Sequence, residues 1–163
     1  MLKHNEPATF AINRRLMKFN TKTIHGGQEN IDPAYGSVMP PIYQTTTYSQ
    51  STPGGHKGFE YSRSSNPTRR VLENNLAALE NGNYAFAFAS GMAATDAILK
   101  TLNPGDEVVC TNDLYGGSYR LFTKIYEKFN IHFKFVPMGN MEKVAEALNS
   151  KTKMIWVETP TNP

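Results

Sequence analysis

The residues best suited to chemistry lie in the segment 88–95, Phe-Ala-Ser-Gly-Met-Ala-Ala-Thr, where an apolar run leads into a helix start built of small residues. Gly91 lets a ligand approach the backbone closely, and a helix beginning there directs free N–H groups and the positive end of its dipole at that ligand. The segment therefore predicts a phosphate seat. An ordinary tight turn with a packing glycine is an equally good interpretation of this segment alone.

Two further candidates stand at the ends of predicted strands. Tyr115 is followed by Gly116 and Gly117, which add no core volume and permit close approach of a ligand, so its ring is placed to stack on a flat ligand ring. A core tyrosine is the alternative. Glu158 ends an apolar strand, and its carboxylate either caps a backbone group or orients a polar group of a ligand; the pattern does not separate the two.

Tyr61 and Arg63 lie in a region rich in Gly, Pro, Thr and Tyr that shows no regular periodicity. A phenol and a planar guanidinium are well suited to binding phosphate oxygens. An ordinary surface arginine is the alternative. Because residues 21–65 have no core of their own, we expect them to form an extended arm that docks on the rest of the chain or on another subunit.

Helices and strands that alternate from residue 66 onward must position these side chains. Asn66 before Pro67 is a typical helix start, and the leucines at positions 72, 76 and 79 form an apolar stripe that stops at Gly82, a suitable left-handed residue. Such alternation builds a parallel sheet, whose ligands bind beyond the carboxyl ends of the strands. The expected strands are 84–89, 107–111, 131–137 and 153–158, and the further expected helices are 91–102, 117–129 and 141–148.

The composition favours a globular chain without a nucleic-acid or membrane surface. The chain has 163 residues, 39% of them hydrophobic, and its net charge of +3 is spread without a Lys/Arg run. No apolar stretch is long enough to span a membrane, and residues 1–20 are expected to be a disordered leader. The one cysteine, Cys110, lies in an apolar run and is expected to be buried, which favours a reducing, cytoplasmic setting.

Six ordered motifs run through residues 21–163. They are Thr23–Gly27, Pro40–Thr45, Tyr61–Arg69, Ser90–Ala94, Tyr115–Gly117 and Glu158–Pro163. Together they resemble the Cys/Met-metabolism family of pyridoxal-phosphate (PLP) enzymes, which contains cystathionine γ-synthase, γ-lyase and β-lyase. The resemblance implies an α/β fold of the PLP-dependent transferase type I, with an aspartate-aminotransferase-like large domain of mostly parallel sheet behind an N-terminal arm. Residues 66–163 are then the first part of that domain.

The resemblance also implies how the cofactor phosphate is held. Ser90, Gly91 and Met92 are expected to bind it, with backbone N–H groups from Gly91 and Met92. Tyr61 and Arg63 are expected to reach the phosphate of a neighbouring subunit's cofactor. A homo-oligomer, expected to be a tetramer built from dimers, is therefore necessary for activity.

Four residues are implied to contact the cofactor ring or the substrate. Tyr115 is expected to stack on the pyridine ring and to take part in substrate deprotonation. Asn162 is expected to approach the cofactor's phenolic oxygen or the substrate carboxylate, and Glu158 to contact the cofactor. Arg120 is expected to face the substrate.

The family implies elimination or replacement at the γ-carbon of an amino acid such as cystathionine. Gly117 stands where methionine γ-lyases typically carry a reactive cysteine, which favours a cystathionine γ-synthase or γ-lyase. The family's Schiff-base lysine, and the aspartate that pairs with the pyridine nitrogen, lie beyond the last motif. We therefore expect these residues to be an N-terminal portion without turnover of its own; a non-catalytic remnant or subunit-binding fragment is the alternative.

Lys153 is a candidate for the family's Schiff-base lysine, because Ser150–Lys153 matches the Ser-x-Thr-Lys pattern found around that lysine in the family. It precedes the strand that ends at Glu158, which places it at the amino end of the sheet, opposite the ligand edge. We therefore reject Lys153 as the catalytic lysine.

Overall fold

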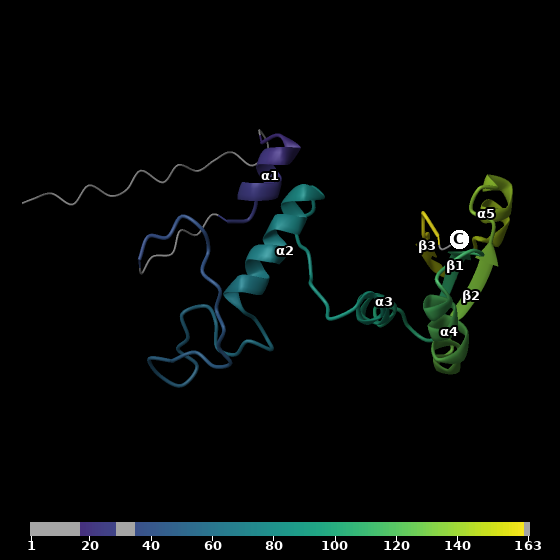
Figure 1. The fold of residues 1–163 in the computed structure, drawn as a ribbon. Helices are drawn as coiled ribbons and strands as arrows, with labels where there is room; N and C mark the ends of the chain where they lie inside the picture. The colour runs from purple at the N-terminus through teal and green to yellow at the C-terminus, as the bar shows by residue number, and fades with distance from the viewer. Residues whose placement is uncertain (1–16, 29–34, 162–163) are drawn as a thin grey trace, which may run out of the picture. The chain divides into compact units, whose positions relative to one another are not determined.

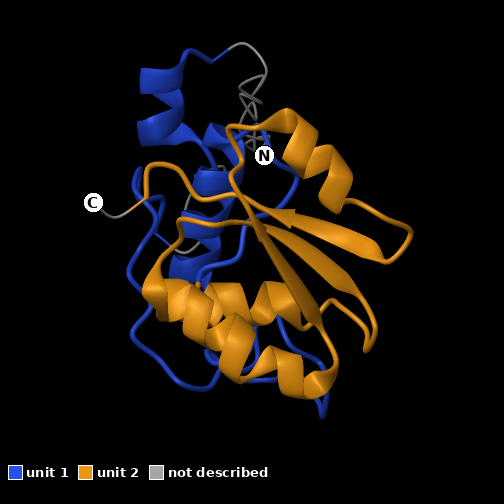
Figure 2. Cartoon of the chain, turned by 90° about the vertical axis from the view of Figure 1, so that its right-hand side faces the viewer, with its two compact units in different colours: residues 1–87 blue, residues 88–163 orange. Residues whose placement is uncertain are grey.

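The structure, a computed structural model, describes residues 17–28 and 35–161. The chain divides into two compact units, which comprise residues 1–87 and residues 88–163 (Figure 2). The division lies after the helix that begins at Pro67, whereas the sequence pattern places the start of the α/β part at residue 66. Most of the expected leader, residues 1–16, lies outside the described residues.

A three-stranded parallel sheet forms the centre of residues 88–163 (Figure 1). Strand β1 (Glu107–Thr111) lies between β2 (His132–Val136) and β3 (Thr152–Trp156). β1 is buried on both faces, since Val108, Val109 and Cys110 have no exposed surface. The strands expected at 107–111, 131–137 and 153–158 are thus confirmed, although β3 ends two residues before the expected limit.

Helices cover both faces of this sheet (Figure 2). The helices α3 (Gly91–Leu99) and α4 (Gly116–Lys124) and the 3-10 turn η2 (Tyr126–Phe129) pack on the face that carries Val108 and Cys110. Helix α5 (Met141–Ala147) lies on the other face, where the Lys134 ammonium donates to the Ala147 carbonyl at 3.2 Å.

The core of the sheet unit is built around Phe122. Its ring stacks on Phe133 with a centroid distance of 4.6 Å and meets Trp156 edge to face at 5.6 Å. Cys110 belongs to the same cluster, which confirms the expectation of a buried thiol. Its burial raises the pKa of the thiol to about 12.

The expected helix 117–129 is broken at Ile125, where α4 gives way to the tighter turn η2. The break places Tyr126 in the core, and its hydroxyl donates to Asp96 Oδ1 at 2.7 Å. Helix α3 also ends earlier than expected, at Leu99 instead of residue 102.

The described residues of the first unit, 17–28 and 35–87, contain two α-helices. Helix α2 (Pro67–Leu79) begins as expected, with Asn66 accepting the Thr68 N–H at 2.8 Å. Helix α1 (Phe19–His25) was not expected, because this part was interpreted as an extended arm. Its C-terminal end is held by α2, since the Asn75 amide donates to the carbonyls of Lys22 and Gly26 at 2.9 and 2.8 Å.

The prediction of a left-handed stop at Gly82 is wrong. Asn81 adopts the left-handed conformation instead, with φ of 53°, and asparagine tolerates it better than most residues. The leucine stripe is also largely uncovered within the described residues, because Leu72 and Leu76 are exposed.

The expected strand at 84–89 is wrong as well. Residues 84–88 have no regular secondary structure and no pairing partner among the described residues, and a strand requires a hydrogen-bonded neighbour. The alternation that suggested a strand is present, since Tyr84 and Phe86 are exposed whereas Ala85 and Ala87 are partly covered.

Candidate functional site

A pocket of about 540 Å³ opens in residues 88–163, at the carboxyl ends of β1 and β3. Its walls come from the first turns of α3 and α4 and from the chain that follows β3. The lining residues are Ser90, Gly91, Met92, Thr95, Tyr115, Ser118, Trp156, Val157 and Glu158. Five of them were singled out from the sequence, so the tertiary structure brings these five together.

The N-terminus of α3 forms one wall of the pocket. Ser90 is the cap, and its hydroxyl accepts the Ala93 N–H at 3.1 Å. The first N–H groups of a helix have no acceptor within the helix, so those of Gly91 and Met92 remain available to a ligand, at the positive end of the helix dipole.

The absence of a side chain at Gly91 leaves space in this wall. Its φ is not positive, so the backbone conformation does not require glycine. A Cβ at this position would meet nothing within 4 Å and would project into open space. Free donors beside such a space fit a phosphate group.

Tyr115 stands at the N-terminal end of α4, and its ring is half-exposed in the pocket. The ring lies against Gly117, where a Cβ would be 2.3 Å from Cε1 and 2.9 Å from Cδ1. The glycine that was interpreted as room for a ligand is therefore room for the tyrosine ring. A side chain at residue 117 cannot coexist with this ring position.

Glu158 has a backbone partner. Its two carboxylate oxygens accept the Tyr115 N–H at 3.2 and 3.1 Å. This carboxylate occupies the N-terminal end of α4, which is favourable for the helix dipole. Of the two roles left open by the sequence, backbone capping is observed. Because a carboxylate occupies the end of α4, the end of α3 is the better seat for an anion.

Arg120 is exposed on α4 and does not line the pocket. Its guanidinium lies beside Gly116, since a Cβ added at Gly116 would be 3.4 Å from Arg120 Nη1. Asn162 lies outside the described residues. The chain just before it is anchored, since the Thr161 hydroxyl donates to Asp113 Oδ2 at 2.7 Å.

Tyr61 and Arg63 belong to residues 1–87. The Arg63 guanidinium lies over the Tyr61 ring, 4.9 Å from its centroid, and Arg63 is exposed. Tyr61 also forms an isolated antiparallel bridge with Thr47. The loop that carries the two candidate phosphate ligands is thus ordered by its own contacts.

Four residues of the pocket were not predicted from the sequence. Thr95 and Ser118 are buried hydroxyl residues in the N-terminal halves of α3 and α4. Trp156 and Val157 come directly before Glu158, and the buried indole N–H of Trp156 has no acceptor among the described residues. The signal for Ser118 was present, since it follows the glycines after Tyr115.

The charge of the pocket walls is negative. Glu158 is the only charged residue among the described residues that line it. Lys153 is exposed on β3, with its ammonium donating to the Ser150 carbonyl at 3.4 Å, and is not a pocket residue. Within residues 17–28 and 35–161, no helix is both long and apolar enough to cross a bilayer.

The chain is similar to a group of curated enzymes. A model of the family described as "Cys/Met metabolism PLP-dependent enzyme" matches residues 20–163. Cystathionine β-lyase of Coxiella burnetii is 52% identical over 154 residues, covering 94% of this chain and 40% of that protein. Cystathionine γ-lyase of Bos taurus is 42% identical over 162 residues, covering 99% of this chain and 40% of that protein. A probable cystathionine γ-synthase of Herpetosiphon aurantiacus is 46% identical over 145 residues, covering 89% of this chain and 45% of that protein.

A solved structure supports the same relationship. metB from Corynebacterium glutamicum superposes with a TM-score of 0.87 at 44% identity, over 93% of this chain and 40% of that chain. The expected α/β fold class is thereby confirmed. The chain spans 40 to 45% of the length of the three curated relatives.

Proposed function

Because this chain belongs to the Cys/Met metabolism family of PLP-dependent enzymes, we propose that the protein acts in transsulfuration, by elimination or replacement at the γ-carbon of a cystathionine-like amino acid. The observation that carries the proposal is the pocket in which the free N-terminus of α3 faces the same space as the Tyr115 ring. An anion seat beside an aromatic ring suits a flat phosphorylated cofactor.

The described residues fit pyridoxal phosphate. Ser90, Gly91 and Met92 would hold its phosphate, and the Tyr115 ring would stack on its pyridine. When bound, PLP supplies an electron sink for the substrate carbon that loses its proton. The Tyr115 phenol would hold or move a proton at that carbon. Glu158, by holding the Tyr115 N–H, would orient this residue.

Outside the pocket walls, two residues are assigned to substrate and cofactor recognition. Asn162 would approach the cofactor's phenolic oxygen or the substrate carboxylate. Arg120 would face the substrate, which requires its exposed side chain to turn toward the pocket mouth. The assignment of Asn162 rests on its position within the motif Glu158–Pro163, and that of Arg120 rests on the resemblance to the family alone.

The cationic partner of the phosphate is assigned to another copy of this chain. The pocket walls contain one carboxylate and, among the described residues, no cation, whereas a phosphate dianion favours Arg. Exposed Arg63, with Tyr61, would supply this contact from a neighbouring subunit. The protein would accordingly be a homo-oligomer, arranged as a tetramer built from dimers. Its buried free thiol at Cys110 suits a reducing cytoplasm.

The choice of the γ-carbon rests on the resemblance to cystathionine γ-synthases and γ-lyases. Gly117, where a cysteine side chain has no room beside the observed Tyr115 ring, disfavours a methionine γ-lyase. The curated relatives carry three different activities in their names, β-lyase, γ-lyase and γ-synthase. The described pocket walls include no lysine. The 163-residue chain on its own is therefore proposed to have no turnover, because none of the described residues that line the pocket carries an amine to bind the cofactor's aldehyde.

The test is a product assay on the protein as its gene encodes it, supplied with PLP and, in separate reactions, with cystathionine or with cysteine and an O-acylated homoserine. Cleavage of the Cγ–S bond consumes water and releases cysteine, 2-oxobutyrate and ammonia. Cleavage of the Cβ–S bond also consumes water and releases homocysteine, pyruvate and ammonia. A synthase joins cysteine to an O-acylated homoserine and releases the acid. We expect 2-oxobutyrate or cystathionine; pyruvate with homocysteine would refute the γ-carbon assignment.

Two companion measurements address the residues. Tyr115→Phe keeps the ring and loses the phenol, so PLP should still bind while kcat falls about a hundredfold or more; an unchanged kcat would remove the proton-transfer role. The 163-residue chain alone should release no keto acid. Release of pyruvate or 2-oxobutyrate by that chain would contradict its proposed inactivity.

A further inference from the structure

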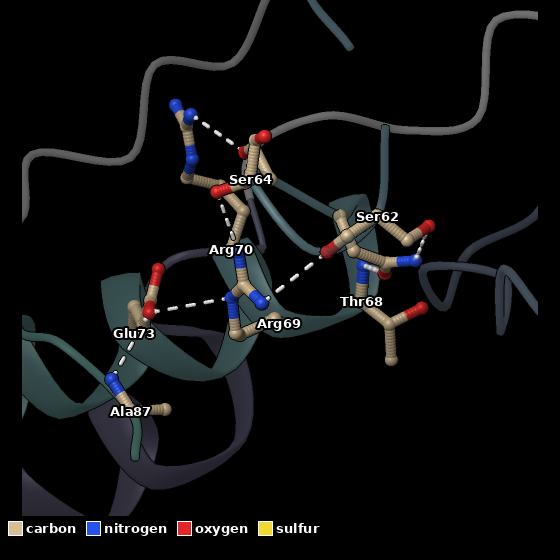
Figure 3. Close-up of polar contacts among 9 residues, drawn as sticks. Ser62, Ser64, Thr68, Arg69, Arg70, Glu73 and Ala87 are labelled. Atoms are coloured by element: carbon tan, nitrogen blue, oxygen red, sulfur yellow. Dashed lines mark hydrogen bonds and ion pairs between the residues drawn. The ribbon is translucent and has the colours of Figure 1, made fainter. Parts of the chain in front are cut away.

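Arg69, in the first turn of α2, holds both carbonyl groups that flank Arg63 (Figure 3). Its Nη1 donates to the Ser62 carbonyl at 3.3 Å and its Nη2 to the Ser64 carbonyl at 2.8 Å. A planar guanidinium serves two acceptors at once, which the single ammonium of a lysine does less well. One side chain therefore fixes the backbone on both sides of Arg63.

The same guanidinium is tied to the chain that leads toward Ser90. Arg69 Nε lies 3.7 Å from Glu73 Oε1, and this oxygen also accepts the Ala87 N–H at 3.0 Å (Figure 3). Glu73 is the more covered partner, with 17% of its side chain exposed against 35% for Arg69. A continuous set of contacts thus runs from the loop 62–64 to the backbone three residues before Ser90.

Arg69 and Arg63 differ in what occupies their donors. The guanidinium of Arg69 faces two carbonyls and a carboxylate, all from its own chain. Arg63 is exposed and stacks on Tyr61. Arg69 is therefore suited to hold the loop and Arg63 to meet a ligand.

We propose that Arg69 is a positioning residue for cofactor binding. By holding the carbonyls of Ser62 and Ser64 it sets the direction of Arg63, and by way of Glu73 it ties this loop to the chain that enters the phosphate seat. This inference rests on the proposed function, in which Arg63 binds the phosphate of PLP. Arg69 itself does not touch the cofactor.

PLP titration of the cofactor-free protein, encoded by its complete gene, tests the proposal. Arg69→Gln should weaken PLP binding by about tenfold, and Arg69→Lys should restore it only in part. Arg70→Gln is the matched control: Arg70 neighbours Arg69, but contacts the Ser65 hydroxyl and the Phe59 ring. Its affinity should stay within about twofold of wild type. Complete rescue by lysine would indicate a role for charge alone and overturn the proposal.

A double-mutant cycle separates positioning from direct binding. If Arg69 acts through Arg63, the double variant Arg63→Gln/Arg69→Gln should bind PLP no more weakly than Arg63→Gln alone. Losses that multiply in the double variant would show independent effects and refute the proposal.

A second readout needs no cofactor and no activity. Trypsin cleaves after arginine, so cleavage between Arg63 and Ser64 reports how firmly this loop is held. Cleavage at this bond should be faster in Arg69→Gln than in wild type or Arg70→Gln. If Arg69→Gln does not fold, the PLP titration and the trypsin cleavage are made on Arg69→Lys instead. Equal cleavage rates after Arg63 in Arg69→Lys and wild type would then contradict the proposal.

The outcomes distinguish the inference from the proposed function. If Arg63→Gln weakens PLP binding while Arg69→Gln does not, the positioning role falls and the phosphate role of Arg63 stands. If Arg63→Gln leaves PLP affinity unchanged, Arg63 does not bind the phosphate, and the positioning role of Arg69, which depends on it, is refuted as well.

Discussion

Replacing Gly117 with alanine should displace the ring of Tyr115. A Cβ at residue 117 would lie 2.3 Å from Cε1, 2.9 Å from Cδ1 and 3.0 Å from Cζ, whereas ordinary contact begins at 3.4 Å. The ring must therefore move by about 1 Å. Overpacking of a closed core costs about 1–3 kcal/mol. Because Tyr115 is half-exposed and has room to swing away, we expect a cost near the lower limit.

Gly116→Ala is the matched control for this prediction. Both glycines lie in α4, so both substitutions gain similar helix propensity, up to about 1 kcal/mol. A Cβ at residue 116 would meet only Arg120 Nη1, at 3.4 Å. The difference in free energy of unfolding between the two variants, measured by urea denaturation, therefore isolates the collision with Tyr115. It should be about 1 kcal/mol, with Gly117→Ala the less stable.

Cofactor binding gives the second measurement. Trp156 is the one tryptophan among the 163 residues and lines the same pocket, so PLP bound there should quench its fluorescence. Loss of the aromatic contact with Tyr115 should make Gly117→Ala bind PLP about three- to tenfold more weakly than Gly116→Ala. Equal affinity and equal stability of the two variants would refute the observed ring position as the basis of binding.

Three further predictions follow from single residues. Gly91→Ala should not lower the free energy of unfolding, since its Cβ would meet nothing within 4 Å and alanine favours the helix, yet it should weaken PLP binding about tenfold by filling the seat. Gly139→Ala, equally free of contacts, should bind PLP as wild type does, and equal affinities of the two variants would contradict the seat. Burial raises the pKa of Cys110 to about 12, so iodoacetamide should alkylate this thiol in urea and not in the folded protein, and rapid native labelling would contradict the core packing. A hydrogen bond from Lys134 holds the pKa of Glu107 below its ordinary value of 4.5, so the stability that this ion pair contributes is present above pH 4.5 and is lost as the pH falls through the lowered pKa. Glu107→Gln should therefore flatten the decline of Tm below about pH 4.5, and an acid profile equal to that of wild type would contradict this prediction.

Local patterns predicted the helix starts and the central strand. Asn66 caps α2 by accepting from Thr68, and Ser90 caps α3 by accepting from Ala93. Each contact spans no more than three residues, so its determinants are contiguous in the sequence. The apolar run Glu107–Thr111 was equally informative, because a central parallel strand is buried on both faces.

Patterns that depend on distant partners were less informative. The alternation at residues 84–89 is typical of a strand, yet no described residue pairs with it. The leucine stripe of α2 predicts a covered face, yet Leu72 and Leu76 are exposed within the described residues. Helix α1 was missed because its C-terminal end is held by Asn75, which lies 53 residues from Lys22.

The sequence by itself indicated five of the nine residues that line the candidate pocket, because these five stand at strand ends or helix starts that are recognisable locally. Only the tertiary structure decided what they touch. Glu158 accepts the N–H of Tyr115 from 43 residues away, and Gly117 accommodates the ring of Tyr115. The physical reason is that the parallel pairing of β1 with β3 brings the two strand ends together, and no local pattern encodes which strands pair.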